Sequence, residues 1–248
     1  MYEERASALA GAVVWTKSPA PGAPAGPGAS PAPVRPVLPD GCMDLLWTPG
    51  RLFVAGPDTR AQPPQGGPGD RFAGIRFAPG TAPAVLGVPA YELRDRRVEL
   101  ADLWGAAGAR RLTERVDAAA DPPAELESVA LETAARRAAE GVRPDPLLTR
   151  VAGLLDGGAP VAAAADEVGL GARTLHRRAL DAFGYGPKTL ARVLRLQRAL
   201  ALVGRGAPYA CAAAAAGYAD QAHFAREMRA LSGMTPSGYG TGARAVPA

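Results

Sequence analysis

Histidine and cysteine are both scarce in this chain of 248 residues, which contains two of each. Both histidines, His176 and His223, lie in the C-terminal half, so residues 1–142 have none. A facial metal triad needs imidazole ligands, and a serine triad needs a histidine base. The two cysteines, Cys42 and Cys211, are too few for a disulfide framework or a four-thiolate zinc site. We therefore expect no enzymatic activity, no catalytic residue, no metal and no cofactor.

Long apolar runs are absent too. The longest stretches of low polarity are short alanine-rich segments such as 161–165 and 211–216, whereas a membrane-spanning helix needs about 20 apolar residues. The first residues include Glu3, Glu4 and Arg5 and lack the apolar core of a secretory signal. We expect no membrane segment and a cytoplasmic location.

Positive charge is concentrated at one end of the chain. Residues 1–142 contain 15 Lys/Arg and 17 Asp/Glu, a net charge of −2, and residues 143–248 contain 13 and 7, a net charge of +6. A basic C-terminal half attracts a polyanionic partner. An arginine-rich composition can also reflect a GC-rich genome, so charge alone leaves the partner open.

Residues 1–105 are expected to form a β-rich domain. Apolar runs alternate with Gly and Pro breaks, as in an antiparallel sheet or a small barrel, at 12–15, 43–47, 52–55 and 72–77. The segment between Trp15 and Val37 is dominated by Pro, Gly, Ala and Ser and is expected to be a mobile loop. We predict an α+β chain in which a barrel-like β domain precedes an all-α domain.

Helix formers dominate from residue 106 onward. Helices are expected near 109–117 and 124–139, the second ending before Gly141 and Pro144. The segment 106–144 is interpreted as a helical linker and a candidate dimer contact. Short helices should follow over 145–240, and 241–248 should form a flexible tail.

Residues 161–183 have the spacing of a helix-turn-helix. A short helix at 161–168 and a turn at Gly169 and Leu170 precede a second helix at 172–183. The second helix carries an apolar stripe made by Leu175, Ala179, Ala182 and Phe183. Three polar side chains lie on its opposite side, namely Arg173, His176 and Arg177. Such groups can bind base edges or phosphates, although a solvated face explains this motif equally well.

The same pattern recurs with a helix at 209–216, a turn at 217–218 and Asp220 as the N-cap of a helix at 221–231. Its buried positions are Phe224, Met228 and Leu231, and its outward positions are Gln221, Ala222, Arg226 and Arg229. A helix from Pro187 to about residue 203 separates the motifs and would span about 25 Å. It could place two recognition helices in successive major-groove segments, about 34 Å apart. Its own arginines are expected to face solvent or the DNA backbone, at Arg192, Arg195 and Arg198.

These motifs carry a family resemblance. The run GYADQAHFAR at 217–226, followed by GMTPSGY at 233–239, resembles the signature of the AraC/XylS family of transcription regulators. In the first motif, LHRR, GYGP and RLQRA match the family's corresponding run in order and spacing, at 175–178, 184–187 and 195–199. The resemblance covers about residues 146–240.

The resemblance implies sequence-specific binding of double-stranded DNA. It places the base-facing positions at Arg173, His176 and Arg177 in the first motif and at Gln221, Ala222 and Arg226 in the second. Ala222 is too short for polar readout, so it contacts a thymine methyl group or nothing. Ala179 stands where the family usually has Phe, and Gly171 replaces a small hydroxyl residue. We therefore expect the first motif to pack loosely or bind weakly.

Family members often carry an effector-binding β domain in front, so residues 1–105 are interpreted as a sensor for an unknown small molecule. RNA polymerase and a second copy of the chain are further candidate partners. Runs at 39–47, 72–80 and 86–89 resemble a poorly characterised domain found before such regulators. Asp40, Asp44 and Arg76 are candidates for lining a pocket or anchoring buried hydrogen bonds.

Three alternatives stay open or are disfavoured. Cys42 is a small core residue or a sensing thiol, and His223 supports packing or the backbone rather than reading a base. The alternative function is a small-molecule-binding or enzymatic β-barrel protein with a helical appendage. A pure protein-interaction module would not need the duplicated helix-turn-helix spacing.

Overall fold

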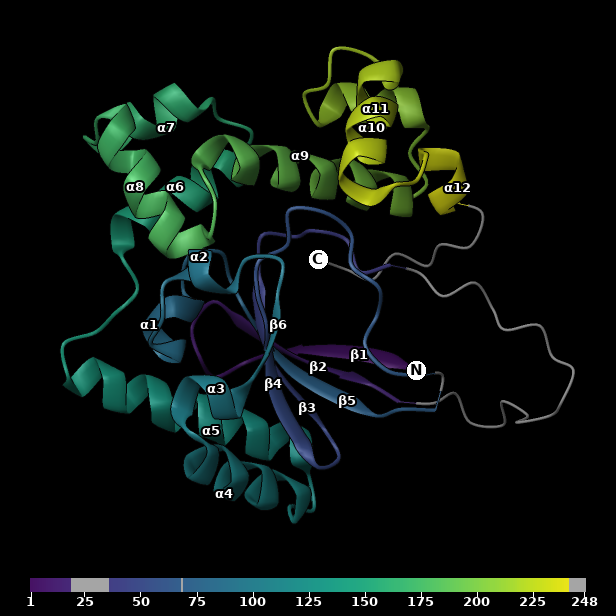
Figure 1. Ribbon diagram of the computed structural model, residues 1–248. Helices are drawn as coiled ribbons and strands as arrows, with labels where there is room; N and C mark the ends of the chain where they lie inside the picture. Colours follow the sequence, from purple (N-terminus) through teal and green to yellow (C-terminus); the bar gives the residue numbers. More distant parts are fainter. Residues whose placement is uncertain (19–35, 68, 241–248) are drawn as a thin grey trace, which may run out of the picture.

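The computed structural model describes residues 1–18, 36–67 and 69–240 (Figure 1). The expected mobile loop after Trp15 falls mostly outside these residues, as does the expected tail 241–248. Within the described part, none of the helices combines the length and apolarity needed to cross a bilayer.

The N-terminal half is built around one antiparallel sheet. Its strands pair in the order β1 (Tyr2–Ala6), β2 (Ala12–Lys17), β5 (Phe72–Phe77), β3 (Met43–Thr48), β4 (Arg51–Ala55) and β6 (Arg97–Glu99). The four predicted strands are present, and the α+β class is confirmed. Among the described residues, β1 and β6 are the two edges, so the strands form an open sheet and not the closed barrel that the apolar runs also allowed.

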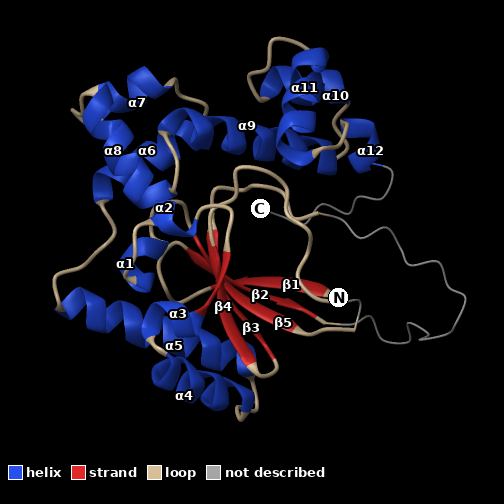
Figure 2. Cartoon of the chain, viewed as in Figure 1, coloured by secondary structure: helices blue, strands red, loops and turns tan. Residues whose placement is uncertain are grey.

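Helices cover one face of this sheet, as Figure 2 shows. They are α1 (Ala82–Leu86), α2 (Ala90–Leu93), α3 (Leu100–Trp104), α4 (Ala106–Asp117) and α5 (Pro122–Ala139). Leu45 and Ile75 of the sheet share a core with Leu126 and Val129 of α5, and all four side chains are buried. Each side chain of this size contributes about 1.5–3 kcal/mol when buried. The segment 106–144 therefore packs on the sheet with its apolar side.

A buried carboxylate fastens α5 to the strand edge. Glu127 accepts hydrogen bonds from the Ser7 hydroxyl and the Ala8 amide, both at 2.7 Å, and pairs with Arg5 at 2.7 Å. Burial alone would raise the pKa of Glu127, but these partners outweigh it and lower the pKa below its ordinary value. The turn after β1 is thus held to α5 by an ionised group.

The C-terminal half is entirely helical. It comprises α6 (Pro146–Asp156), α7 (Val161–Glu167), α8 (Ala172–Phe183), α9 (Pro187–Gly204), α10 (Tyr209–Ala215), α11 (Gln221–Ser232) and α12 (Pro236–Gly240). The first part of α9 packs with α6, α7 and α8 through Leu190 and Leu194, and its second part packs with α10 and α11 through Leu196 and Leu200. At 18 residues, α9 is about 27 Å long. One helix therefore serves two small cores, and Figure 1 shows them at its two ends.

Candidate nucleic-acid interface

The helices α8 and α11 are equivalent parts of a repeat. Each has 12 residues and ends at a glycine in the left-handed region, Gly184 with φ 79° and Gly233 with φ 72°. An L-residue with a side chain rarely adopts this conformation, so glycine suits both ends. The sixth residue of each helix is an arginine, Arg177 in α8 and Arg226 in α11. The two motifs therefore present the same cation at the same place.

All six predicted base-facing residues are exposed: Arg173, His176, Arg177, Gln221, Ala222 and Arg226. Within the described part of the chain, none of their side chains forms a hydrogen bond or an ion pair. The same holds for Lys188, Arg205 and Arg229, so this half of the molecule presents several cations without internal partners. Because these cations have no internal ion pair to break, they are available for charge-assisted hydrogen bonds to an external anion.

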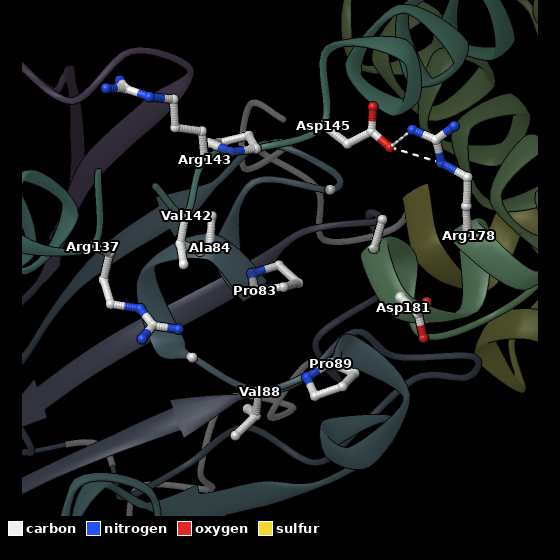
Figure 3. A pocket seen from close by; sticks show the side chains of 14 residues that line it. Pro83, Ala84, Val88, Pro89, Arg137, Val142, Arg143, Asp145, Arg178 and Asp181 are labelled. Carbon is white, nitrogen blue, oxygen red and sulfur yellow. Dashed lines mark hydrogen bonds and ion pairs between the residues drawn. The ribbon is translucent and has the colours of Figure 1, made fainter. Parts of the chain in front are cut away.

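The seventh residues of the two helices are used internally instead. Arg178 of α8 donates from Nε to Asp145 Oδ2 at 2.9 Å, in a crevice of about 430 Å³ where the two halves meet (Figure 3). Glu227 of α11 accepts from Arg192 Nε at 2.9 Å. On each helix, the sixth residue is thus an outward arginine, and the seventh residue takes part in an internal ion pair.

The arginines of α9 differ from the prediction that they face solvent or the DNA backbone. Arg192 pairs with Glu227, and the Arg195 guanidinium lies 5.5 Å from the centre of the Tyr218 ring. Arg198 donates to the carbonyls of Leu155 at 3.0 Å and Asp156 at 2.6 Å. These side chains connect α9 to the motifs on both sides because their partners lie in α6, in α11 and in the turn before α11.

The helix N-termini differ between the motifs. Asp220 caps α11 by accepting a hydrogen bond from the His223 amide at 2.5 Å, whereas α8 begins after Gly171 with no side-chain cap. A side-chain oxygen at this position satisfies a backbone amide that otherwise lacks an intrahelical partner.

Ala179, which stands where the family usually has Phe, is fully buried in the core of the first motif, with a relative exposure of 0%.

A cavity of about 480 Å³ lies on the sheet face that α4 and α5 leave free. Its floor comes from Trp15, Leu46, Phe53 and Phe72, and its other walls include Gln197 of α9 and Tyr239 of α12. The volume is within the range of small-molecule sites, about 300–1,000 Å³. Both halves of the molecule therefore contribute to one cavity.

Charged groups in this cavity gather around Arg76. Its Nε lies 3.5 Å from Asp40 Oδ2 and 3.4 Å from Asp44 Oδ1, and its Nη1 lies 3.3 Å from Glu4 Oε1. The Nε is buried without a hydrogen-bond partner in the described part of the chain, although both aspartates lie close enough for Coulomb attraction. Burial raises the pKa of Asp44 even though Arg76 acts to lower it. In this cluster, three carboxylates therefore surround one guanidinium.

Comparison with known proteins identifies the C-terminal motifs. Residues 164–241 match a family model described as a helix-turn-helix domain. This region is an AraC-type DNA-binding domain. Residues 22–99 match a domain of unknown function, DUF6597. No curated protein matches the chain significantly.

Solved structures similar to this chain include ToxT from Vibrio cholerae. A ToxT structure in a P21 crystal form is 10% identical with a TM-score of 0.45, and the match covers 95% of this chain and 96% of that one. A structure of wild-type ToxT with bound unsaturated fatty acid, from strain SCE256, is 11% identical with a TM-score of 0.43 and covers 82% and 88%.

The two histidines of the AraC-type domain, His176 and His223, each lie close to a neighbouring turn. His223 supports packing, since its Nδ1 accepts from the Ala219 amide at 3.4 Å and its ring meets Tyr218 edge-on at 5.2 Å. His176 is exposed, but its ring lies against Gly186, where a Cβ would be 2.7 Å from the imidazole Cε1. It therefore sits beside the turn into α9.

The cavity brings together the predicted Asp40, Asp44 and Arg76, and adds groups that the sequence did not single out. Asp58 and Arg97 form a bidentate pair at 2.9 and 2.7 Å in its wall. Cys42 also lines the cavity, and burial and then Asp40 raise the pKa of its thiol well above the ordinary value. A thiol held in this form is a poor nucleophile, which argues against the sensing role.

Proposed function

We propose that this chain regulates transcription by reading two successive major-groove segments with α8 and α11, under the control of a small molecule bound in the cavity. The observation that carries the proposal is the division of arginines. Arg177 and Arg226 occupy equivalent outward positions without internal partners, whereas Arg178, Arg192 and Arg198 are engaged within the protein. Free guanidinium groups on paired recognition helices are suited to guanine edges and phosphates.

The spacing of the two motifs supports the same proposal. The helix α9 has 18 residues and extends about 27 Å, and a recognition helix packs near each of its ends. Successive major-groove segments on one side of B-DNA are about 34 Å apart. Two helices attached to one rod of this length suit adjacent segments of a single duplex.

The cavity supports control by a ligand because its walls come from both halves. Gln197 donates from Nε2 to the carbonyl of Pro39 at 2.5 Å, and the Ala61 amide donates to the carbonyl of Leu231 at 2.7 Å. A ligand shifts an equilibrium only if it binds one arrangement better than the other. A molecule that contacts both the sheet and α9 meets this condition.

The test is a selection of genomic duplex fragments with the full-length chain, followed by titration of a selected and an unselected fragment at 50 and 200 mM salt. The proposal expects preferential binding of the selected fragment and a steep loss of affinity at the higher salt, about 10³-fold or more if six or more phosphates are contacted. Absence of any sequence-selective fragment would contradict it. Contact with RNA polymerase and pairing of two copies through 106–144 stay predictions from the sequence.

A further inference from the structure

The N-terminal half contacts both recognition helices at their carboxyl ends. The carbonyl of Gly184, which ends α8, accepts a hydrogen bond from Arg94 Nη1 at 3.2 Å. The carbonyl of Leu231, in the last turn of α11, accepts one from the Ala61 amide at 2.7 Å. The last carbonyls of a helix lack partners within the helix, so external donors satisfy them. Each recognition helix is therefore held at the end that carries none of its predicted base-facing residues.

The end of α8 also rests directly on residues of the N-terminal half, and Figure 1 shows α2 beside it. A Cβ on Gly184 would lie 2.6 Å from Pro57 Cγ and 3.1 Å from the carbonyl oxygen of Ala90. Arg94 follows α2 directly, and in the described part of the chain its guanidinium has no carboxylate partner. A cation at the carboxyl end of a helix is stabilised by the helix dipole. Arg94 and Pro57 therefore both fix the position of this helix end.

The donors for the two helices belong to segments that are bonded to each other. One donor lies in residues 56–61 and the other in residues 93–97, and we call these two segments the clamp. The Asp95 amide donates to the carbonyl of Pro57 at 3.1 Å, and the Asp95 carboxylate accepts from the Thr59 amide at 2.7 Å and the Thr59 hydroxyl at 2.8 Å. Asp95 has φ 58°, a conformation that costs free energy for a residue with a side chain. These bonds offset that cost, so Asp95 joins the two segments in one arrangement.

The clamp also forms part of the cavity wall. Gly56, Asp58 and Arg97 line the cavity, and Asp58 and Arg97 form a bidentate pair with each other. A molecule that fills the cavity therefore touches the element that contacts both recognition helices.

We propose that the clamp sets the positions of both recognition helices on DNA, with Arg94 as the positioning residue for α8 and Asp95 as the residue that joins the two contacts. The inference rests on the proposed function, because it gives the clamp a role in reading DNA. Loss of the Arg94 side chain releases the end of α8 alone, since the Ala61 amide still bonds α11. Loss of the Asp95 carboxylate loosens the joint between the two segments and so affects both helices.

The DNA test uses the full-length chain and a selected duplex with single base substitutions in either contacted segment, well below the thermal midpoint of each variant. The segment of α8 is the one in which R177A relaxes the preference. R94A should lower discrimination in this segment by about fivefold or more and change it by less than about twofold in the other. R94K keeps a cationic donor and should recover most of the loss. D95G, in which glycine adopts φ 58° without strain but cannot hold Thr59, should lower discrimination in both segments.

Arg96 supplies the matched control from the same part of the clamp. It is exposed like Arg94, but its Nη1 donates to the nearby carbonyl of Glu92 at 3.0 Å and not to a recognition helix. R96A should leave discrimination in both segments unchanged. Equal effects of R96A and R94A, equal losses in both segments from R94A, or full discrimination in R94A would each overturn the proposal.

A second readout needs no DNA. Hydrogen–deuterium exchange of the free chain should be about threefold faster or more in R94A for the last turn of α8, residues 180–184, with the last turn of α11, residues 229–233, unchanged. D95G should speed exchange at both helix ends, and R96A at neither. If this pattern is found but no DNA fragment is selected, the proposed function fails while the link between the clamp and the helices stands. Unchanged exchange in both R94A and D95G would overturn the proposal even if the chain selects a DNA fragment.

Discussion

The sixth and seventh residues of α8 and α11 differ in their partners, and this difference gives the first prediction. Arg177 and Arg226 are exposed and have no internal partner in the described part of the chain, so replacing either with alanine should change the free energy of unfolding by less than about 0.5 kcal/mol. Each should weaken binding to the selected duplex by about 1–3 kcal/mol, or about 5- to 150-fold, if the arginine reads a guanine.

The adjacent residue supplies a matched control within the same helix. Arg178 pairs with Asp145, and the two side chains are 33% and 29% exposed. R178A should lower the free energy of unfolding by about 0.5–1 kcal/mol, as for other partly exposed ion pairs. Its effect on the sequence preference of the bound DNA should be small.

The assay combines urea unfolding with footprinting and titration of each variant on matched and single-substituted duplexes. R226A should relax the preference in one segment of the site, and R177A should relax it in the other. Equal weakening on all sequences would show that these arginines contact phosphates, and the base-reading assignment would then be wrong. A loss of preference in R178A but not in R177A would refute the structural argument itself.

Three further predictions concern stability. The Trp15 indole lies over Gly74, where a Cβ would be 2.4 Å from the indole Cε2, so G74A should destabilise the fold by about 1–3 kcal/mol through overpacking, as measured by thermal unfolding. Replacing Trp15 with leucine in the G74A chain should recover most of this loss. If the effects of the two substitutions were simply additive, the contact between Trp15 and Gly74 would be contradicted. Because the pKa of Glu127 is lowered from its ordinary 4.5, its contribution is present above that pH and is lost as the pH falls below it. Urea unfolding of E127Q should therefore show a loss of about 1–3 kcal/mol at pH 7 that shrinks by pH 3, and a constant difference would argue against an ionised Glu127. D220A should lower the free energy of unfolding by about 0.5–2 kcal/mol because α11 loses its N-cap, whereas G171S should raise it by a few tenths of a kcal/mol. A gain from G171S as large as the loss from D220A would not fit the observed caps.

The regular elements with strong apolar patterns were predictable from the sequence. The stripes led by Leu175 and Phe224 predicted α8 and α11 because helix burial repeats every three to four residues. The edge strand β1 was not predicted, since its sequence YEERA is mostly charged, which is common at sheet edges. The strand β6 and the helices α1 to α3 are three to five residues long, too short for periodicity to show.

The candidate sites were predictable only where a residue type carried the information. Asp40, Asp44 and Arg76 were singled out because each is polar within an apolar run. The role of Trp15 depends on its pairing with Gly74 across β2 and β5, a register that the sequence does not state. The arginines of α9 were assigned to solvent or DNA because their partners, such as Glu227 and the carbonyl of Leu155, come from distant parts of the chain.

The continuity of α9 has a consequence for any operator. Since the helix runs unbroken from Pro187 to Gly204 and contributes side chains to both motifs, neither motif can slide or swivel without the other. Roughly five base pairs inserted between the contacted segments would carry the second segment to the opposite side of the duplex, and about ten would restore its direction but move it a full turn away. The continuous helix α9 therefore fixes the distance between the two contacted DNA segments. Natural targets should differ in their base sequence but not in the spacing of these segments.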